Sequence, residues 1–284
     1  MQNKIPLLIY LILLITITAS AGETRTFNAW NISYTIPQNW ALEQQIGRLH
    51  TLKSNSGGAM IYAAPGKYSD NQQAFNAVAV FVANAGMSST PIEQPHNTTI
   101  AGKTVYTGIY WLTDRSMQRI KAQFVTVLTK HGTGLNALLV APPSEFDQAV
   151  AAIEKIAASM MAKAPVIDRN MMRTLAGSWV YYDANSTSSI ASSGYSSRSY
   201  QETVKFDGSG GFSWHSTSHV SVDSRITSSG GWSGASNFGN NTDSGQYTVI
   251  GSTIIFVGKN GQQSFDFMLQ GGKLMTGNKT FIRE

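Results

Sequence analysis

The chain has 284 residues, enough for about two domains, since single domains commonly contain about 100–200 residues. Hydrophobic residues make up 42% of the chain and can form buried cores, whereas charged residues make up only 13%, about half of the usual share. The formal charge of +5 is not gathered into a basic block or stripe. A nucleic-acid-binding protein normally concentrates its positive charge, so nucleic acid is excluded as an expected partner.

The first 21 residues have the pattern of a secretory signal peptide. A short positive start, "MQNK", precedes the apolar run "IPLLIYLILLITIT" and an A-x-A cleavage site at Ala19-Ser20-Ala21. The apolar run is shorter than the ~20 residues that a membrane-spanning helix needs, so cleavage after Ala21 is predicted and no span is expected afterwards. The absence of cysteine indicates a bacterial periplasmic or secreted protein, because exported eukaryotic proteins of this size usually carry disulfides.

Residues 22–168 alternate between strand and helix patterns. Apolar runs or alternation predict strands over residues 32–37, 58–65, 103–112, 118–128 and 135–141. One helix is predicted to follow a cap at Ser69, and a second is predicted to follow a cap at Ser144 and to stop at Pro165. The order β-β-β-α-β-β-β-α predicts an α+β domain in which helices pack on an antiparallel sheet.

The segment "ISYTIPQNW", residues 32–40, resembles the opening strand and Pro-x-x-Trp corner of the PsbP-like fold. This fold is shared by extrinsic photosystem subunits and by DcrB-type bacterial envelope proteins. The resemblance implies a scaffold for the N-terminal half, since the family is rarely enzymatic, and it implies no catalytic residue.

Residues 169–284 lack helical periodicity, and residues 165–174 are expected to form a linker. About eight short strands separated by glycine turns predict a small up-and-down antiparallel β-barrel, with a sandwich as the alternative. Two stretches rich in serine and glycine, residues 184–200 and 224–245, interrupt this pattern. They are predicted to be mobile loops.

Gly177-x-Trp179 in the first strand and Arg283 in the last resemble the pattern of short bacterial lipocalin-like domains. The resemblance implies that Gly177 and Trp179 lie at the closed end of the barrel. It also implies that Arg283 packs over the indole, a cation–π contact worth ~0.5–2 kcal/mol. These three residues are thus expected to close the barrel and not to contact a ligand.

A set of inward-facing aromatic residues forms the candidate ligand-binding site. An eight-stranded barrel is either filled by its own side chains or able to hold one small ligand, and both alternatives stay open. The candidate lining residues are Tyr181, Phe206, Phe212, Trp214, Tyr247, Phe265 and Phe267.

The sequence gives only weak indications of residues grouped to bind a metal or to catalyse a reaction. His215 and His219 would lie roughly 13 Å apart along a strand, too far to share an ion with each other and Asp223. The fragment "GWSGA" lacks the last glycine of a serine-hydrolase elbow. No catalytic residue, metal or cofactor is therefore expected.

The sequence thus predicts an exported, non-enzymatic binding protein. It would hold a small apolar ligand in the barrel or dock an envelope protein partner. The alternatives are a secreted serine-type hydrolase that uses His215 and a pure interaction scaffold.

Overall fold

The structure is a computed structural model that describes residues 22–189, 194–226, 231–259 and 261–284. The predicted signal peptide lies outside these residues. The chain divides into two compact units. The first contains the chain up to Thr26, Ser33–Leu128 and Gly134–Met161, and the second contains Phe27–Ile32, Thr129–Thr133 and Ala162–Glu284. The main change of unit along the chain thus falls between Met161 and Ala162.

The first unit is built around a seven-stranded sheet in the order β3-β4-β5-β9-β8-β7-β6. Its strands are β3 (Trp40–Ile46), β4 (Leu49–Ser54), β5 (Met60–Lys67), β6 (Ser88–Ile100), β7 (Lys103–Thr113), β8 (Arg119–Leu128) and β9 (Thr133–Ala141). A three-stranded sheet joins β1 (Thr24–Phe27), β2 (Ile32–Thr35) and β10 (Met161–Ala162), and η1 (Asn28–Trp30) is a short 3-10 helix. The predicted α+β class is confirmed. Strand β6 escaped prediction because it is almost wholly exposed and carries two prolines, so it shows no apolar alternation.

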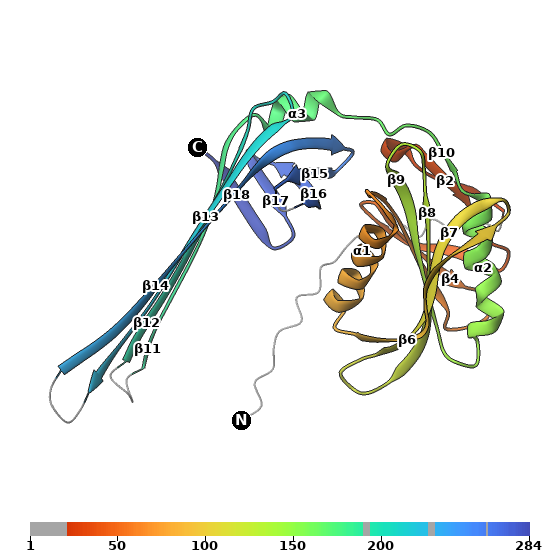
Figure 1. Cartoon of the computed structure of the whole chain (residues 1–284), viewed down its shortest axis with the longest axis horizontal. Coiled ribbons are helices and arrows are strands. Elements are labelled where there is room, and N and C mark those ends of the chain that lie inside the picture. Colours follow the sequence, from red (N-terminus) through yellow and green to blue (C-terminus); the bar gives the residue numbers. More distant parts are fainter. Residues whose placement is uncertain (1–21, 190–193, 227–230, 260) are drawn as a thin grey trace. The chain divides into compact units, whose positions relative to one another are not determined.

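Helices α1 (Asn71–Asn84) and α2 (Phe146–Ser159) lie on opposite sides of this sheet (Figure 1). Successive side chains of a strand point to opposite faces, and β8 serves both helices in this way. Phe124 contacts Phe75 of α1 at a ring-centroid distance of 4.9 Å. The Lys121 ammonium lies 5.2 Å from the ring of Phe146 in α2. The sheet is therefore covered on both faces.

The helix boundaries differ in detail from those predicted. The cap of α1 is Asp70, one residue after the predicted Ser69, and its carboxylate accepts the amide hydrogen of Gln73 at 2.8 Å. Helix α2 follows Glu145, one residue after the predicted cap at Ser144, and ends well before Pro165. Asp70 takes the capping role expected of Ser69, whereas the side chain of Glu145 makes no capping hydrogen bond and accepts the amide hydrogen of Gly58 at 2.8 Å.

The second unit is a closed barrel in which β11 to β18 follow one another around the wall (Figure 1). Its strands are β11 (Gly177–Ser189), β12 (Gly194–Phe206), β13 (Gly211–Ile226), β14 (Gly231–Ile250), β15 (Thr253–Gly258), β16 (Gly261–Gln270), β17 (Lys273–Thr276) and β18 (Lys279–Arg283). Neighbours pair antiparallel, and β11 closes the circle by pairing Trp179 with Arg283 and Val180 with Ile282. The predicted up-and-down barrel is confirmed.

The expected linker before the barrel is wrong in part, because it contains helix α3 (Arg169–Leu175). Asp168 begins this helix by accepting the amide hydrogen of Met171 at 2.8 Å. Met172 and Leu175 are buried in the barrel core. The helix was not predicted from the sequence, because its apolar residues pack against the barrel and do not form a separate apolar core.

The four strands β11 to β14 are 13, 13, 16 and 20 residues long. Each of them is longer than the part that forms the barrel wall. Val180, Thr203, His215 and Thr242 form one cross-strand row. Beyond this row the strands continue as a four-stranded sheet, which we call the extension (Figure 1). Its segments are Tyr181–Ser189, Gly194–Glu202, Ser216–Ile226 and Gly231–Asn241.

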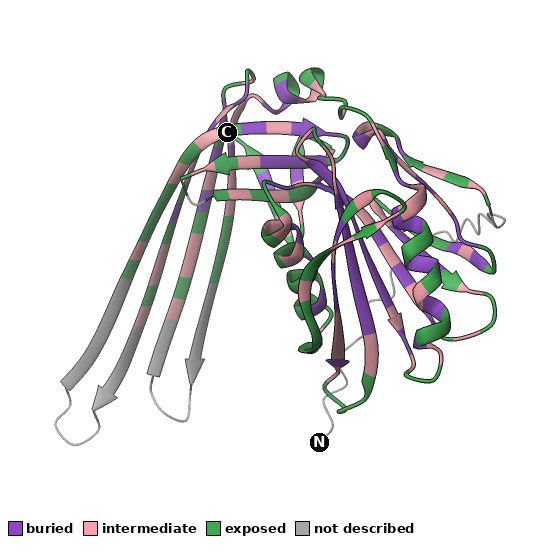
Figure 2. Cartoon of the chain, turned by 45° about the vertical axis from the view of Figure 1, so that its right-hand side comes forward, coloured by how far each residue is buried: buried purple, intermediate pink, exposed green. Residues whose placement is uncertain are grey.

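The extension overturns the prediction of two mobile loops, because most of residues 184–200 and 224–245 are strand. Figure 2 shows the described part of the extension mostly as exposed or intermediate residues. Apart from Glu202 and Ser216 in the first row, the side chains of the extension that the structure describes are not buried, so these strands have little need of apolar alternation. Their regularity comes from backbone hydrogen bonding between neighbours, which small polar residues support as well as large ones.

The turn between β12 and β13 supplies a test of stability against pH. One carboxylate oxygen of Asp207 accepts the amide hydrogens of Ser209, Gly210 and Gly211 at 2.8, 2.9 and 2.8 Å. Hydrogen bonds from the Ser209 and Gly211 amides hold the pKa of this carboxyl below its ordinary value. Its stabilising effect is therefore complete above the unfolded pKa of about 3.9 and is lost as the pH falls through the lower folded value.

We expect Asp207→Ala to lower the urea midpoint of the second unit at pH 7 and to have a smaller effect at pH 3. The Asp207→Asn variant keeps an acceptor that does not titrate and should show less dependence on pH than the wild type. Equal losses for Asp207→Ala at both pH values would contradict this role of the carboxylate.

Candidate functional site

Gly177, Trp179 and Arg283 meet at one end of the barrel. The Trp179 side chain is 1% exposed, and its indole N–H donates to the Leu175 carbonyl at 2.8 Å. The Arg283 guanidinium carbon lies 4.9 Å from the indole centroid, and the group donates to the carbonyls of Thr174 and Ala176 at 2.7 and 2.5 Å. These contacts fasten α3 over this end of the barrel.

Gly177 has a backbone requirement of its own at this end. Its φ is +123°, a conformation that residues with a side chain rarely adopt. A Cβ added there would lie 3.5 Å from the Arg283 Nε. The glycine therefore lets the chain turn from α3 into β11 directly under the guanidinium.

The aromatic residues proposed to line a cavity mostly pack against one another. Four of the seven are buried, namely Phe206, Phe212, Tyr247 and Phe267, while Tyr181 and Trp214 are partly buried against the same cluster. The Phe206 and Tyr247 ring centroids are 4.7 Å apart. The described inward side chains therefore form one packed cluster inside the barrel.

Phe265 differs from the other candidates. It is 43% exposed, and its ring contacts Phe256 at 5.9 Å without joining the buried cluster. The only buried residue of β16 is Phe267. Alternation predicted that Phe265 also faces inward, but the barrel core does not extend to this position of the strand.

An ion pair between the buried Glu202 and the partly exposed Lys279 lies at the first row of the extension and was not found from the sequence. The Glu202 carboxylate accepts hydrogen bonds from the Trp214 indole at 2.8 Å, from the Tyr200 hydroxyl at 3.0 Å and from the Lys279 ammonium. The ammonium also lies 5.6 Å from the Tyr181 ring and 5.3 Å from the Tyr200 ring. We call these five residues the junction cluster.

Two members of the junction cluster, Lys279 and Tyr200, have raised pKa values. Burial acts to lower the pKa of Lys279, but the hydrogen bond and the charge of Glu202 outweigh it and raise this pKa above its ordinary value. Burial, followed by the charge of Glu202, raises the pKa of Tyr200. The lysine therefore stays protonated and the tyrosine neutral, which suits a structural closure better than proton transfer. The signal in the sequence was Glu202, which shares a strand face with Val204 and Phe206.

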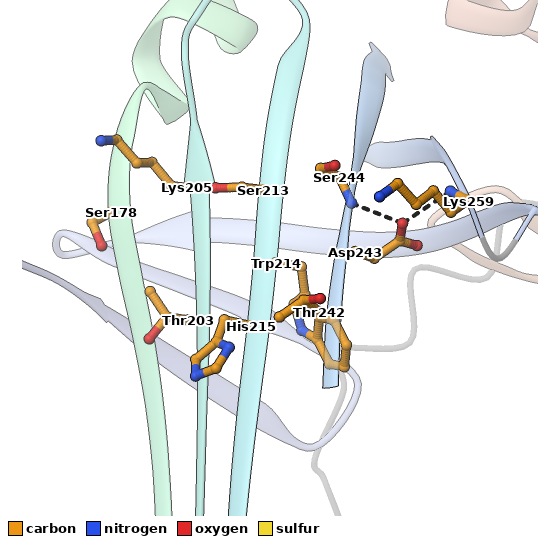
Figure 3. Close-up of a pocket in the computed structure, with 10 residues that line it drawn as sticks. All are labelled: Ser178, Thr203, Lys205, Ser213, Trp214, His215, Thr242, Asp243, Ser244 and Lys259. Atoms are coloured by element: carbon orange, nitrogen blue, oxygen red, sulfur yellow. Dashed lines mark hydrogen bonds between the residues drawn. The ribbon is translucent and has the colours of Figure 1, made fainter. Parts of the chain in front are cut away.

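A groove lies next to the junction cluster on the same strands, and Figure 3 shows its lining side chains. The groove is lined by Ser178, Thr203, Lys205, Ser213, Trp214, His215, Thr242, Asp243, Ser244 and Lys259. The Asp243 carboxylate accepts the amide hydrogens of Ser244 and Lys259 at 2.7 and 2.9 Å. Most of the lining residues carry a hydroxyl or an ammonium group.

The hydrolase fragments do not gather into a catalytic arrangement. "GWSGA", residues 231–235, lies within strand β14 and not at a turn from a strand into a helix. In the described part of the chain, no hydrogen bond joins His215 to a serine hydroxyl, the contact that a serine nucleophile needs from its base. The side chain of Asp223 lies outside the described residues, and within them no three His, Cys, Asp or Glu side chains are grouped to hold a metal ion.

The extension has two open edges. Strand β18 pairs with β11 only as far as Val180, and β15 pairs with β14 only from Gly245 onward. Among the described residues, no strand pairs with the outer side of Tyr181–Ser189 in β11 or of Gly231–Asn241 in β14. Open edges offer unpaired backbone donors and acceptors to another chain.

The edge strands of the first unit are protected, which makes the open edges of the extension distinctive. Strand β3 has a register shift between Leu42 and Gln44, and β6 has two shifts and contains Pro91 and Pro95. Bulges and prolines are devices that prevent pairing at an edge. The pairing rows of the extension run without a shift.

Each edge strand of the extension also carries an exposed aromatic residue on the face that bears the groove. Tyr182 of β11 is 64% exposed, and Phe238 of β14 is 75% exposed. The Phe238 ring lies 4.5 Å from the His219 ring, centroid to centroid. Exposed aromatic side chains are typical of surfaces that become covered by a partner.

No known protein family matches the sequence, and no curated protein is similar to it. Two solved structures are similar in fold. Cyanobacterial PsbP (CyanoP) from Synechocystis sp. PCC 6803 has 10% identity and a TM-score of 0.36, with 52% of this chain and 95% of that chain covered. The PA94 protein of unknown function from Pseudomonas aeruginosa has 15% identity and a TM-score of 0.31, with 50% and 96% covered. The first match is to the family that "ISYTIPQNW" resembles.

These likenesses concern the fold alone and say nothing of what this chain binds. A separate finding bears on the membrane. Within the described ranges, no helix combines the length and the apolar character needed to cross a bilayer.

Proposed function

We propose that this chain is an exported, non-enzymatic binding protein that docks a protein partner through the open edges of the extension. The observation that carries the proposal is the pair of long edge strands without bulge or proline. Partners often add a strand to such an edge, because the backbone groups there are already aligned for pairing. The close packing of the barrel interior supports docking over the enclosure of a small apolar ligand.

The hydrogen-bond pattern identifies which residues present their backbone to a partner. The amide of Glu284 donates to the carbonyl of Ser178 at 3.0 Å, so even-numbered residues of β11 face away from β12. The amide of Tyr247 donates to the carbonyl of Gly210 at 2.6 Å, so odd-numbered residues of β14 face β13. Ala184 in β11 and Asn240 in β14 therefore point their N–H groups toward the open edges.

The test uses proline at these two positions. Ala184→Pro with Asn240→Pro removes an outward N–H from each edge and spares the hydrogen bonds to β12 and β13. The immobilised wild-type chain should capture a protein from bacterial envelope extract, and the double proline variant should capture at least about tenfold less. The matched control, Ala184→Ser with Asn240→Ala, keeps both N–H groups and should behave as the wild type. Equal capture by all three proteins would contradict docking at the edges.

Export gives a separate prediction. When the whole chain is expressed in a bacterium, mass spectrometry of the periplasmic fraction should find a mature protein that begins at Gly22, because Ala19-Ser20-Ala21 is an A-x-A site. An Ala21→Arg variant should keep the full-length mass, since a large charged residue blocks cleavage. A wild-type protein that stays in the cytoplasm with residues 1–21 attached would contradict export.

The non-enzymatic proposal is tested by labelling with a serine-reactive fluorophosphonate. We expect no serine to be labelled, because His215 has no serine hydroxyl bonded to it in the described residues. A single labelled serine that is lost in His215→Ala would replace this proposal by the hydrolase alternative.

A further inference from the structure

We infer that the partner at the β14 edge is a second copy of this chain. Two extensions would join by antiparallel pairing of β14 with β14 about a two-fold axis and form one continuous eight-stranded sheet. The inference rests on the proposed function, since it requires the open edges to be docking elements.

The first argument is charge. The open stretch of β14, "GWSGASNFGNN" from Gly231 to Asn241, contains no charged residue. A two-fold axis places the same edge on both sides of the interface, so a neutral edge meets no like charge in its copy. The open stretch of β11 contains Asp183, and pairing with itself would bring two carboxylates to one edge.

The second argument is length and regularity. The open stretch of β14 is the longer of the two, and β14 pairs with β13 from Gly231 to Gln246 without a register shift. A second β14 can therefore follow it without a break in the ladder. Each outward N–H and C=O group that is now exposed would gain a partner.

The third argument is the exposed aromatic residue. Phe238 is 75% exposed, and its backbone faces the open edge because it is an even-numbered residue of β14. In an antiparallel pair, side chains on one face lie opposite each other across the two strands. Pairing would place the two Phe238 rings on the same face of the joined sheet and cover a surface that water now contacts.

The experiment measures association of the purified chain by sedimentation velocity over a wide concentration range. We expect a reversible dimer. Asn240→Pro should raise its dissociation constant about tenfold or more, because each subunit loses one outward donor. Asn240→Ala keeps the N–H and should stay within about twofold of the wild type. Circular dichroism and thermal unfolding of both variants report whether the fold is retained.

A cysteine scan identifies the strand that forms the contact. The chain contains no cysteine, so each single substitution adds the only thiol. A two-fold axis places only the residue nearest the axis opposite its own copy, at a Cα–Cα distance of about 4.5–5.5 Å. Under mild oxidation, one of Phe238→Cys and Asn240→Cys should therefore give a disulfide-linked dimer more readily than the other. Tyr182→Cys, on the other edge strand, should stay monomeric under the same conditions. The position that links fastest reports the register.

Three results would overturn the inference. These are a chain that is monomeric at every concentration, a dimer that persists in Asn240→Pro, and linkage through Tyr182→Cys in place of the β14 positions. If a monomeric chain still captures an envelope protein that the double proline variant loses, the second copy is rejected and the proposed function stands. If neither association nor capture depends on the edges, both are rejected.

Discussion

Replacing Trp179 with alanine should lower the free energy of unfolding of the barrel unit by about 4 kcal/mol. The indole is 1% exposed and lies among the buried side chains of the barrel core, so its removal leaves a cavity that the wall cannot fill. Its N–H also holds the Leu175 carbonyl, and its ring supports the Arg283 guanidinium. We expect a second, lower transition in calorimetry while the transition of the first unit stays in place.

Two controls separate the roles of the ring and the cation. Trp179→Phe keeps part of the volume and should be less harmful than Trp179→Ala. Arg283→Ala leaves the core filled and should cost about 1–2 kcal/mol, the loss of the cation–π contact and of hydrogen bonds to the end of α3. A larger loss for Arg283→Ala than for Trp179→Ala would show that the guanidinium, and not the indole, closes this end.

Replacing Glu202 with alanine should lower the free energy of unfolding by about 2 kcal/mol, because the change removes a buried charged acceptor and leaves a partly buried ammonium without its counter-ion. The carboxylate is the shared acceptor for Trp214, Tyr200 and Lys279. Without it, the half-buried ammonium keeps its charge against the tyrosine rings and loses its counter-ion. Urea denaturation followed by far-UV circular dichroism would measure the effect.

A double-mutant cycle tests whether the loss comes from the unpaired charge. Lys279→Met removes the ammonium and keeps much of the side-chain volume, so Glu202→Ala should be less destabilising in that background than in the wild type. Glu202→Gln keeps an acceptor for the indole and should lie between the wild type and Glu202→Ala. Additive losses in the cycle would mean that the ion pair contributes little and that Glu202 acts through its hydrogen bonds to the aromatic residues.

Much of the barrel was predictable because its inward residues leave a local signal. Val204 and Phe206 on β12 alternate with polar neighbours, and the structure buries both. Phe265 shows the limit of the same signal, since an apolar residue at the right parity can lie where the wall has no core behind it. Alternation reports which way a residue points, and only the neighbouring strands decide whether it is buried.

The candidate docking site was less predictable. The serine- and glycine-rich stretches contain no periodic apolar pattern, so the sequence indicated loops where the structure has the longest strands. Their strand character depends on backbone pairing between segments that are distant in sequence, as between Gly194 of β12 and Ser224 of β13. Each open edge begins at the residue where two neighbouring strands stop pairing. No local residue pattern indicates the position of that residue.

By itself, the sequence determined an α+β half and a barrel half, because burial imposes periodic apolar residues on helices and strands. The closure of the barrel by Gly177, Trp179 and Arg283 was implied by the resemblance to lipocalin-like domains. The tertiary structure alone decided that α3 covers the closed end, that Glu202 and Lys279 meet 77 residues apart in the chain, and that four strands continue beyond the barrel. These features depend on contacts between distant segments, and a polar strand exposed on both faces has the same local composition as a loop.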